Sequence, residues 1–306
     1  MSQIGGVESQ PTSGSGERLA LALLLAAPLL ISSNPIIGRA AVDIVPPVAL
    51  AFWRWAVAAL ILLPFTWFGL VRHATVLRRH ILLIGLLGSL GMGVCGAFVY
   101  IGLQHTTATT ASIIYAISPV MMLVIVWLFE REPIRLHQII GVTIAIVGVL
   151  VIVSRGALDQ LLAITFNIGD LWVLGSAASW AVYSVLLRRL TGLLPTFTLF
   201  TAIVLAGVLS LAPFYAIETA MGRPVVWNQE AAISIGAVAL LASVLAFSAF
   251  QKGIALVGAA RSGPFMYLMP VYGVILATLF LGEAFAIFHG AGLLLVISGV
   301  ALASRR

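Results

Sequence analysis

Long apolar runs separated by short polar connections dominate the pattern along the chain. Each run holds about 18 residues or more, close to the length that a helix needs to cross a bilayer. The apolar residues are continuous and do not alternate with period two, which argues against a membrane β-barrel. The pattern predicts an all-α polytopic membrane protein. We expect ten transmembrane helices, at residues 19–41, 47–71, 81–103, 108–129, 136–153, 169–188, 195–217, 231–251, 258–281 and 286–303.

Composition agrees with this pattern. Hydrophobic residues make up 61% of the chain and charged residues only 8%, and the mean hydropathy is +1.15. Soluble domains carry about 25% charged residues, so we expect the lipid bilayer to be the surroundings of this chain. The net charge of +6 would suit nucleic acid. The cations lie at helix ends, however, where orientation signals belong, so we expect no nucleic-acid partner.

The distribution of lysine and arginine predicts the orientation. If the N-terminus is cytoplasmic, twelve of these residues fall at inner helix ends and two in outer loops. The inner ones are Arg18, Arg72, Arg78, Arg79, Arg131, Arg135, Arg188, Arg189, Lys252, Arg261, Arg305 and Arg306, and the outer ones are Arg155 and Arg223. The positive-inside rule therefore places both termini in the cytoplasm. Residues 1–16 form a polar Gly/Ser-rich tail without a basic segment, which we expect to be disordered and not a cleaved signal peptide.

An internal repeat relates the two halves of the chain. At a separation of 151 residues the repeat pairs Gly102 with Gly253, Pro119 with Pro270, Glu132 with Glu283, Gly141 with Gly292 and Gly148 with Gly299. In the earlier part a separation of 149 pairs Arg39 with Arg188, Pro46 with Pro195 and Pro64 with Pro213. Each copy holds five helices, an odd number, so the second copy is inverted in the membrane. We expect one five-helix unit at residues 17–154 and its inverted copy at 168–306, an arrangement typical of alternating-access transporters.

The chain resembles the EamA-type, ten-helix metabolite exporter branch of the drug/metabolite transporter superfamily. The residues that carry the resemblance are a Pro-X-X-X-Ala-X-X-Arg pattern at Pro47, Ala51 and Arg54, the stretches "TTATTASIIYAISPV" and "GDLWVLGSAASWAVYSVLLRRL", the run from Pro270 to Glu283, and "GLLLVISGVAL" near the end. The chain departs from the family in the first helix, where Ser33, Asn34 and Pro35 replace a tryptophan before Asn-Phe.

The resemblance implies a bacterial-type inner-membrane protein that exports small metabolites. Amino acids, including aromatic ones, are the first expectation, and drugs or nucleobase-type metabolites are the alternative. We expect a small-molecule substrate, no cofactor and no metal. We expect a monomer, with a dimer as the alternative.

No acidic residue lies at mid-membrane depth by these ranges, since all ten are in the tail or near helix ends. Carriers coupled to protons or sodium keep a carboxylate there, so its absence favours a facilitator or an exchanger. An enzyme would need paired acids, a histidine cluster or a metal set. The only close acidic pair of the chain, Glu130 and Glu132, flanks Arg131 at an expected cytoplasmic end, so we expect no enzyme. A passive channel is the remaining alternative to a carrier.

Arg54 is the candidate binding residue that the pattern singles out. It lies about seven residues into the second helix, roughly 10 Å deep, and a cation at this depth is by default a functional residue. It either binds a carboxylate or phosphate of the substrate, or it caps backbone carbonyls and holds the bundle together. Asn34 and Tyr115 reach a similar depth on the first and fourth helices. The three side chains form a substrate-binding cluster in one interpretation and polar contacts between helices in the other.

Further candidates lie in the fourth, sixth and ninth helices. Ser176, Trp180 and Tyr183 fall on one face of the sixth helix, and with Tyr267 of the ninth they would form a wall suited to an uncharged or aromatic solute. Ordinary bundle packing is the alternative for this face. Pro119 and Pro270 each remove a backbone hydrogen bond within a helix, and we interpret them as hinges, with tolerated kinks as the alternative.

Overall fold

The structure is a computed structural model that describes residues 14–130, 136–154, 167–257 and 262–303. The helices in the first half are α1 (Gly14–Ala41), α2 (Pro47–Arg72), α3 (Ala74–Arg79), α4 (Ile81–Leu87), η1 (Gly88–Val94), α5 (Cys95–Leu103), α6 (Ala108–Tyr115), α7 (Ser118–Glu130) and α8 (Leu136–Val153). Those in the second half are α10 (Ile168–Leu187), α11 (Thr196–Ala220), α12 (Gln229–Ala237), η2 (Val238–Leu245), α13 (Ala246–Val257), η3 (Gly263–Leu268), α15 (Met269–Leu281) and α16 (Ile287–Ala303). Within these ranges the chain forms no strand.

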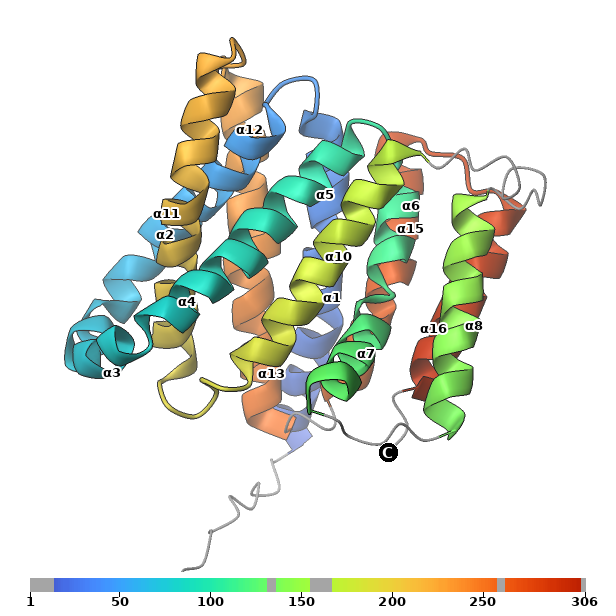
Figure 1. Ribbon diagram of the computed structural model, residues 1–306, viewed down its shortest axis with the longest axis horizontal. Helices are drawn as coiled ribbons and strands as arrows, with labels where there is room; N and C mark the ends of the chain where they lie inside the picture. Colours follow the sequence, from blue (N-terminus) through green and yellow to red (C-terminus); the bar gives the residue numbers. More distant parts are fainter. Residues whose placement is uncertain (1–13, 131–135, 155–166, 258–261, 304–306) are drawn as a thin grey trace, which may run out of the picture.

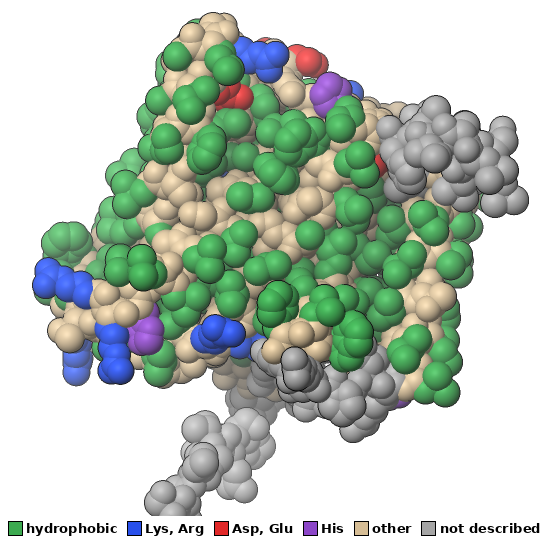
Figure 2. All heavy atoms as spheres, in the orientation of Figure 1, with side chains coloured by type: hydrophobic (Ala, Val, Ile, Leu, Met, Phe, Trp, Pro, Cys, Tyr) green, Lys and Arg blue, Asp and Glu red, His purple; other side chains and the backbone are tan. Residues whose placement is uncertain are grey.

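Seven helical segments are long and apolar enough to cross a membrane. They are Glu17–Ala41, Pro47–Arg72, Ile81–Leu103, Ala108–Phe129, Ile168–Leu187, Thr196–Ala220 and Gln229–Val257, and shorter apolar helices occupy Leu136–Ile152, Phe265–Leu281 and Ile287–Ala303. Apolar side chains are spread over the face of the bundle that Figure 2 shows. Leu82, Phe65 and Phe68 are each more than four-fifths exposed. Such a surface is stable in lipid, and the prediction of an all-helical polytopic membrane protein is confirmed.

The helices lie side by side and share two ends (Figure 1). We call one the Glu218 end; it carries the connections at residues 42–46, 104–107 and 221–228. The other is the α3 end, where α1 begins and α16 ends, together with the connection at residues 188–195. Figure 2 shows several arginine and lysine side chains and a histidine at the α3 end; acidic side chains are visible at the Glu218 end, together with basic and histidine side chains.

Two of the long helices change their winding at matching places. The third predicted span runs through α4, η1 and α5, and the eighth runs through α12, η2 and α13; η1 and η2 are both π-helical. A π-helical turn rotates the residues that follow and exposes backbone carbonyls, and it is often found at functional sites. The two segments occupy repeat-related positions, because Gly88–Val94 and Val238–Leu245 lie 150 to 151 residues apart.

The two predicted hinge prolines both sit at a helix break. The fourth span is interrupted at residues 116–117, and Pro119 is the second residue of α7. The ninth changes from the 3₁₀ helix η3 to α15, of which Pro270 is the second residue. The Tyr115 carbonyl, which the ring of Pro119 frees, accepts a hydrogen bond from the Ser118 hydroxyl at 2.6 Å. The breaks are therefore present in the fold; a hinge motion at either proline stays a prediction.

Glycines let α8 and α16 approach each other closely. A Cβ built on Gly299 would lie 2.5 Å from the Ala145 nitrogen and 2.6 Å from the Gly141 oxygen. One on Gly141 would lie 2.6 Å from the Gly299 oxygen, and one on Gly148 would lie 2.9 Å from the Gly292 oxygen. Small residues allow this backbone contact, which replaces side-chain packing where lipid offers no hydrophobic driving force. Elsewhere in the bundle α2 packs on α11, and α1 packs on α13 and α15.

Candidate functional site

The best-defined polar cluster surrounds Arg54 inside the bundle. Arg54 lies about two turns below the start of α2, and its side chain is only 6% exposed. Its Nε donates a hydrogen bond to the Ser243 hydroxyl at 2.8 Å, and its second terminal nitrogen lies 3.5 Å from the Ala242 carbonyl oxygen. Both partners belong to η2. The π-helical winding of η2 is thus the local structure that turns a hydroxyl and a carbonyl toward the guanidinium.

Asn34 and Tyr100 complete the cluster from the first half of the chain. The Asn34 Oδ1 accepts from Arg54 at 2.9 Å and from the Tyr100 hydroxyl at 2.6 Å. The Tyr100 oxygen also accepts from Arg54 at 3.1 Å. The guanidinium is therefore held by α1, α2, α5 and η2, which connects the two halves.

The partners of Arg54 are all uncharged. In the described part of the chain its acceptors are hydroxyl, side-chain amide and peptide carbonyl oxygens, and no carboxylate pairs with it. The guanidinium carbon also lies 4.4 Å from the centre of the neighbouring Trp55 ring, a cation–π distance. Neutral acceptors orient a cation but leave its charge uncompensated, and an uncompensated cation inside a membrane is costly. Within the described residues the charge of Arg54 is therefore held by neutral groups alone.

A second polar cluster adjoins the first. The Cys95 thiol and the Tyr115 hydroxyl lie 2.7 Å apart, and the Ser176 hydroxyl donates to the Cys95 carbonyl at 2.7 Å. Both clusters use α5, which carries Cys95 and the Tyr100 of the Arg54 cluster. The cluster joins α5 and α6 of the first half to α10 of the second.

The predicted site residues are thus distributed over several places. Asn34 and Arg54 come together as expected, whereas Tyr115 lies in the Cys95 cluster and makes no hydrogen bond to Arg54 in the described structure. Trp180 and Tyr183 contact each other, with ring centres 4.9 Å apart. Tyr183 is buried against Gly91, where a built Cβ would lie 2.6 Å from its ring.

Two observations concern the rest of the predicted wall. Tyr267 is half-buried in η3. The hydroxyls of Ser176 and Ser179 donate to the Cys95 and Leu90 carbonyls, in and beside the π-helical segment η1. Much of the polar face of α10 is therefore engaged in contacts between helices.

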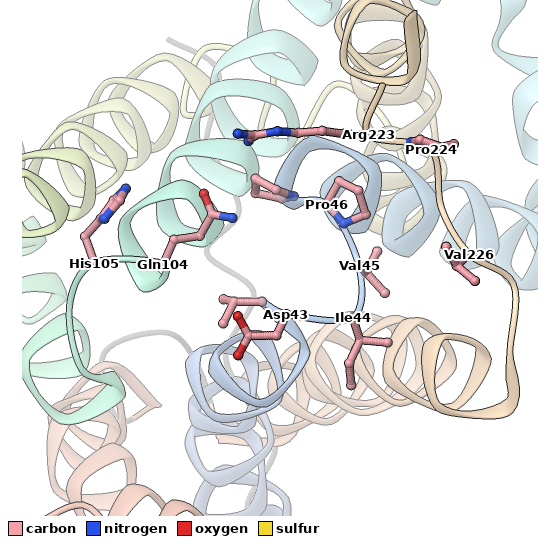
Figure 3. Close-up of a pocket in the computed structure, with 11 residues that line it drawn as sticks. Asp43, Ile44, Val45, Pro46, Gln104, His105, Arg223, Pro224 and Val226 are labelled. Atoms are coloured by element: carbon pink, nitrogen blue, oxygen red, sulfur yellow. The ribbon is translucent and has the colours of Figure 1, made fainter. Parts of the chain in front are cut away.

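An open recess lies at the Glu218 end between the two halves. Its volume is about 560 Å³, and its lining comes from residues 42–47, from Gln104 and His105, and from Arg223, Pro224 and Val226. In Figure 3 the side chains of Asp43 and Arg223 lie on opposite sides of the opening. The recess is polar at its rim and is separated from Arg54 by the buried first turns of α2.

Comparisons with known proteins agree with a transport protein. The sequence model of the EamA-like transporter family matches residues 18–154 and again residues 167–305. An uncharacterized transporter of Bacillus subtilis is 27% identical over 84% of this chain and 84% of its own length. A probable terminal-alkyne amino-acid exporter of Streptantibioticus cattleyicolor is 30% identical over 74% of each chain. An S-adenosylmethionine/S-adenosylhomocysteine transporter of Chlamydia trachomatis is 24% identical over 94% of this chain and 88% of its own.

A crystal structure has the same fold, with a TM-score of 0.61 and 20% sequence identity over 96% of this chain and 97% of that one. The two family matches cover nearly the whole chain, and the named relatives are transporters rather than enzymes. This chain is a membrane protein of the EamA-like transporter family.

Proposed function

We propose that the chain is a secondary transporter that exports small metabolites bearing an anionic group, with amino acids, including aromatic ones, as the first candidates. It works by alternating access and without a buried coupling carboxylate. Ten spans form two inverted five-helix units, residues 17–154 and 168–306, after the tail at 1–16. The protein lies in the bacterial inner membrane with both termini in the cytoplasm.

The single observation that carries this proposal is the charge at Arg54. A guanidinium that is 6% exposed and, among the described residues, bonded only to neutral groups favours the entry of an anion. Its second terminal nitrogen has one contact, at 3.5 Å, and so keeps donor capacity for a carboxylate oxygen. Arginine presents paired donors that match a carboxylate. Amino acids and S-adenosylmethionine both carry that group, and relatives are named for exporting or transporting them.

The repeat offers a built-in comparison that supports a binding role. By the repeat offsets, the counterpart of Arg54 is Ile203 and that of Ser243 is Met92. Both counterparts are buried, where α11 packs on η1. Apolar side chains therefore fill the crossing of α11 with η1, whereas a cation lies at the repeat-related crossing of α2 with η2. Stability alone does not require the polar cluster, so a function that is present on one side only accounts for it.

The contact between α8 and α16 supports the inverted repeat. Gly141 meets Gly299, and Gly148 meets Gly292. The repeat exchanges these two pairs, because Gly141 corresponds to Gly292 and Gly148 to Gly299. Such an exchange is the property of two antiparallel helices that cross on a twofold axis in the membrane plane.

Counterflow in proteoliposomes tests the transport function. Vesicles loaded with an unlabelled amino acid should accumulate the labelled one transiently, with no imposed proton or sodium gradient, because a carrier exchanges solutes across its two states. The panel should include aromatic amino acids, nucleobases and cationic drugs. Uptake without stimulation by internal solute would indicate a channel, and abolition of exchange at zero ion gradients would contradict the uncoupled mechanism.

The proposed orientation predicts which positions an impermeant thiol reagent reaches in intact cells. In a Cys95→Ala background, Asn228→Cys at the start of α12 should react from outside. Thr191→Cys, which is exposed in the connection at the α3 end, should react only after permeabilisation. The positive-inside rule gives the reason, since Arg188 and Arg189 closely precede Thr191. The reverse labelling pattern would overturn the orientation.

A further inference from the structure

Glu218 holds the start of a helix in the other half of the chain. It lies near the end of α11, and its two carboxylate oxygens accept from the backbone N–H groups of Val48 at 3.2 Å and Ala49 at 2.8 Å. These N–H groups belong to the first turn of α2, which the proline pair at 46–47 begins without a side-chain cap of its own. The first N–H groups of a helix need outside acceptors. Glu218 therefore acts as the missing cap, supplied from the second half.

Glu283 makes the corresponding contact with a different helix. Its two oxygens accept from the N–H groups of Ala108 and Thr109, both at 2.8 Å, at the start of α6. Gly282 ends α15 with φ of +65°, a conformation that favours glycine, and this turn brings Glu283 to α6. The next N–H group of this first turn, that of Thr110, donates to the Thr107 hydroxyl in the connection before α6. Again an acid of the second half completes a helix of the first.

Both contacts lie at the Glu218 end, where the halves also meet through Thr106 and Asp170, whose side chains are 2.5 Å apart. The recess of Figure 3 opens beside them: it is lined by Pro46 and Pro47, which precede the N–H groups bound by Glu218. The backbone N–H of Arg223, another lining residue, donates to the Glu218 backbone carbonyl at 3.2 Å. The two carboxylates thus bind the first turns of α2 and α6, next to the lining residues 46–47 and 104–105 of the recess.

We infer that Glu218 and Glu283 form a carboxylate clasp, defined as their four hydrogen bonds to the starts of α2 and α6, that closes the transport path at the Glu218 end. This inference rests on the proposed function. Opening at this end separates the halves there, so the four charge-assisted bonds must break and water must take over the helix starts. The clasp therefore sets how often the path opens at this end.

The chemistry of the clasp requires carboxylates. Each acid uses both oxygens to accept from two successive N–H groups, and its negative charge is favoured at a helix N-terminus. Glutamine has one oxygen and an NH₂ group, which would face a donor, so it keeps the shape and loses one bond and the charge. The repeat counterpart of Glu218 is Gly69, which packs directly against Thr198. The Glu218 part of the clasp hence has no acidic counterpart in the repeat, whereas Glu283 corresponds to Glu132, which lies outside the described residues.

The rate at which a reagent labels the native cysteine measures how often the path opens. Cys95 is the single cysteine of the chain, is 7% exposed, and touches both halves through Tyr115 and Ser176. In lipid nanodiscs, where reagent reaches both faces, Glu218→Gln and Glu283→Gln should each raise the rate at which a polar maleimide labels Cys95 by about five- to tenfold. Glu230→Gln is the matched control: Glu230 is exposed at the same end, in the first turn of α12, and should leave the rate unchanged.

Removing the N–H donor at Ala108 tests the contact between α6 and Glu283 without altering any charge. Ala108 is the first residue of α6, a position that accepts proline, and Thr107 before it has the extended conformation that proline requires. Ala108→Pro removes one N–H donor to Glu283 and should raise Cys95 labelling to a similar degree. Combined with Glu283→Gln it should add little, because both changes break one contact.

Three folded clasp variants with wild-type Cys95 labelling would overturn the inference, as would an equal increase in Glu230→Gln. Melting temperature in detergent identifies the folded variants. If no solute shows counterflow while the clasp variants still increase labelling, the proposed function fails and the clasp stands.

Discussion

Replacing Arg54 by glutamine is expected to lower the apparent affinity for an anionic solute by about 30- to 700-fold, while the protein still folds. The variant keeps a polar side chain near Asn34 and Ser243 but removes the positive charge. Loss of a buried charge partner costs about 2–4 kcal/mol in binding. Counterflow at a series of solute concentrations in proteoliposomes gives the affinity, and melting in detergent gives the stability.

Arg54→Lys separates charge from geometry. Lysine keeps the charge but loses the planar donor pair, so we expect weakened transport that remains above the level of Arg54→Gln. Ser243→Ala should have a smaller effect, since it removes only one orienting hydroxyl at 2.8 Å.

Arg39→Gln is the matched arginine control. Arg39 donates to the Leu103 carbonyl at 2.7 Å and makes no contact with the Arg54 cluster in the described structure. Its replacement should lower the melting temperature and leave solute affinity unchanged. A stable Arg54→Gln protein with unchanged affinity would rule out the binding role, and the path would then have to be sought near Trp180, Tyr183 and Tyr267.

The sequence predicts the helices well because their apolar runs are long and their ends carry strong signals. The second helix begins at a proline and ends at arginine, and both the expected range 47–71 and α2 (Pro47–Arg72) follow these markers. The sequence predicts only some of the interruptions inside helices. Pro119 marks the break before α7, whereas the π-helical segments η1 and η2 contain no proline and differ in composition. Their winding depends on packing between the halves, which a linear pattern does not contain.

The site could be predicted only where a residue is unusual for its surroundings. Arg54 stands out because a cation is rare in an apolar run, and Asn34 stands out for the same reason on a neighbouring helix. Tyr100 and Ser243 are ordinary in helical membrane spans, and Ser243 meets Arg54 across 189 residues of chain. Cys95 lies within the expected helix at residues 81–103 and is unremarkable there, yet it connects Tyr115 to the second half. Pairing of this kind follows from the fold and not from spacing.

The second large effect is expected at the crossing of α8 and α16. Gly299→Ala would place a Cβ 2.5 Å from the Ala145 nitrogen and 2.6 Å from the Gly141 oxygen. These neighbours are backbone atoms, so relief requires the two helices to move apart. Overpacking of this kind costs about 1–3 kcal/mol, and Gly299→Leu should prevent α16 from docking on α8. Thermal unfolding in detergent and the yield of monodisperse protein measure both changes.

Two other glycines serve as controls for the glycine-to-alanine substitutions at this crossing. Gly85 on α4 and Gly236 on α12 are related by the repeat, and a Cβ built on either meets nothing within 4 Å. Alanine at these positions should hold or raise the melting temperature, because glycine inside a helix is about 0.5–1 kcal/mol less favourable than alanine. The four glycines thus share one substitution and differ only in what the new methyl group meets. If Gly299→Ala and Gly141→Ala melt like Gly85→Ala and Gly236→Ala, the helices do not pack backbone to backbone, and this support for the inverted repeat is lost. If only the first two are destabilised, the close antiparallel crossing of α8 and α16 is a structural requirement of the fold.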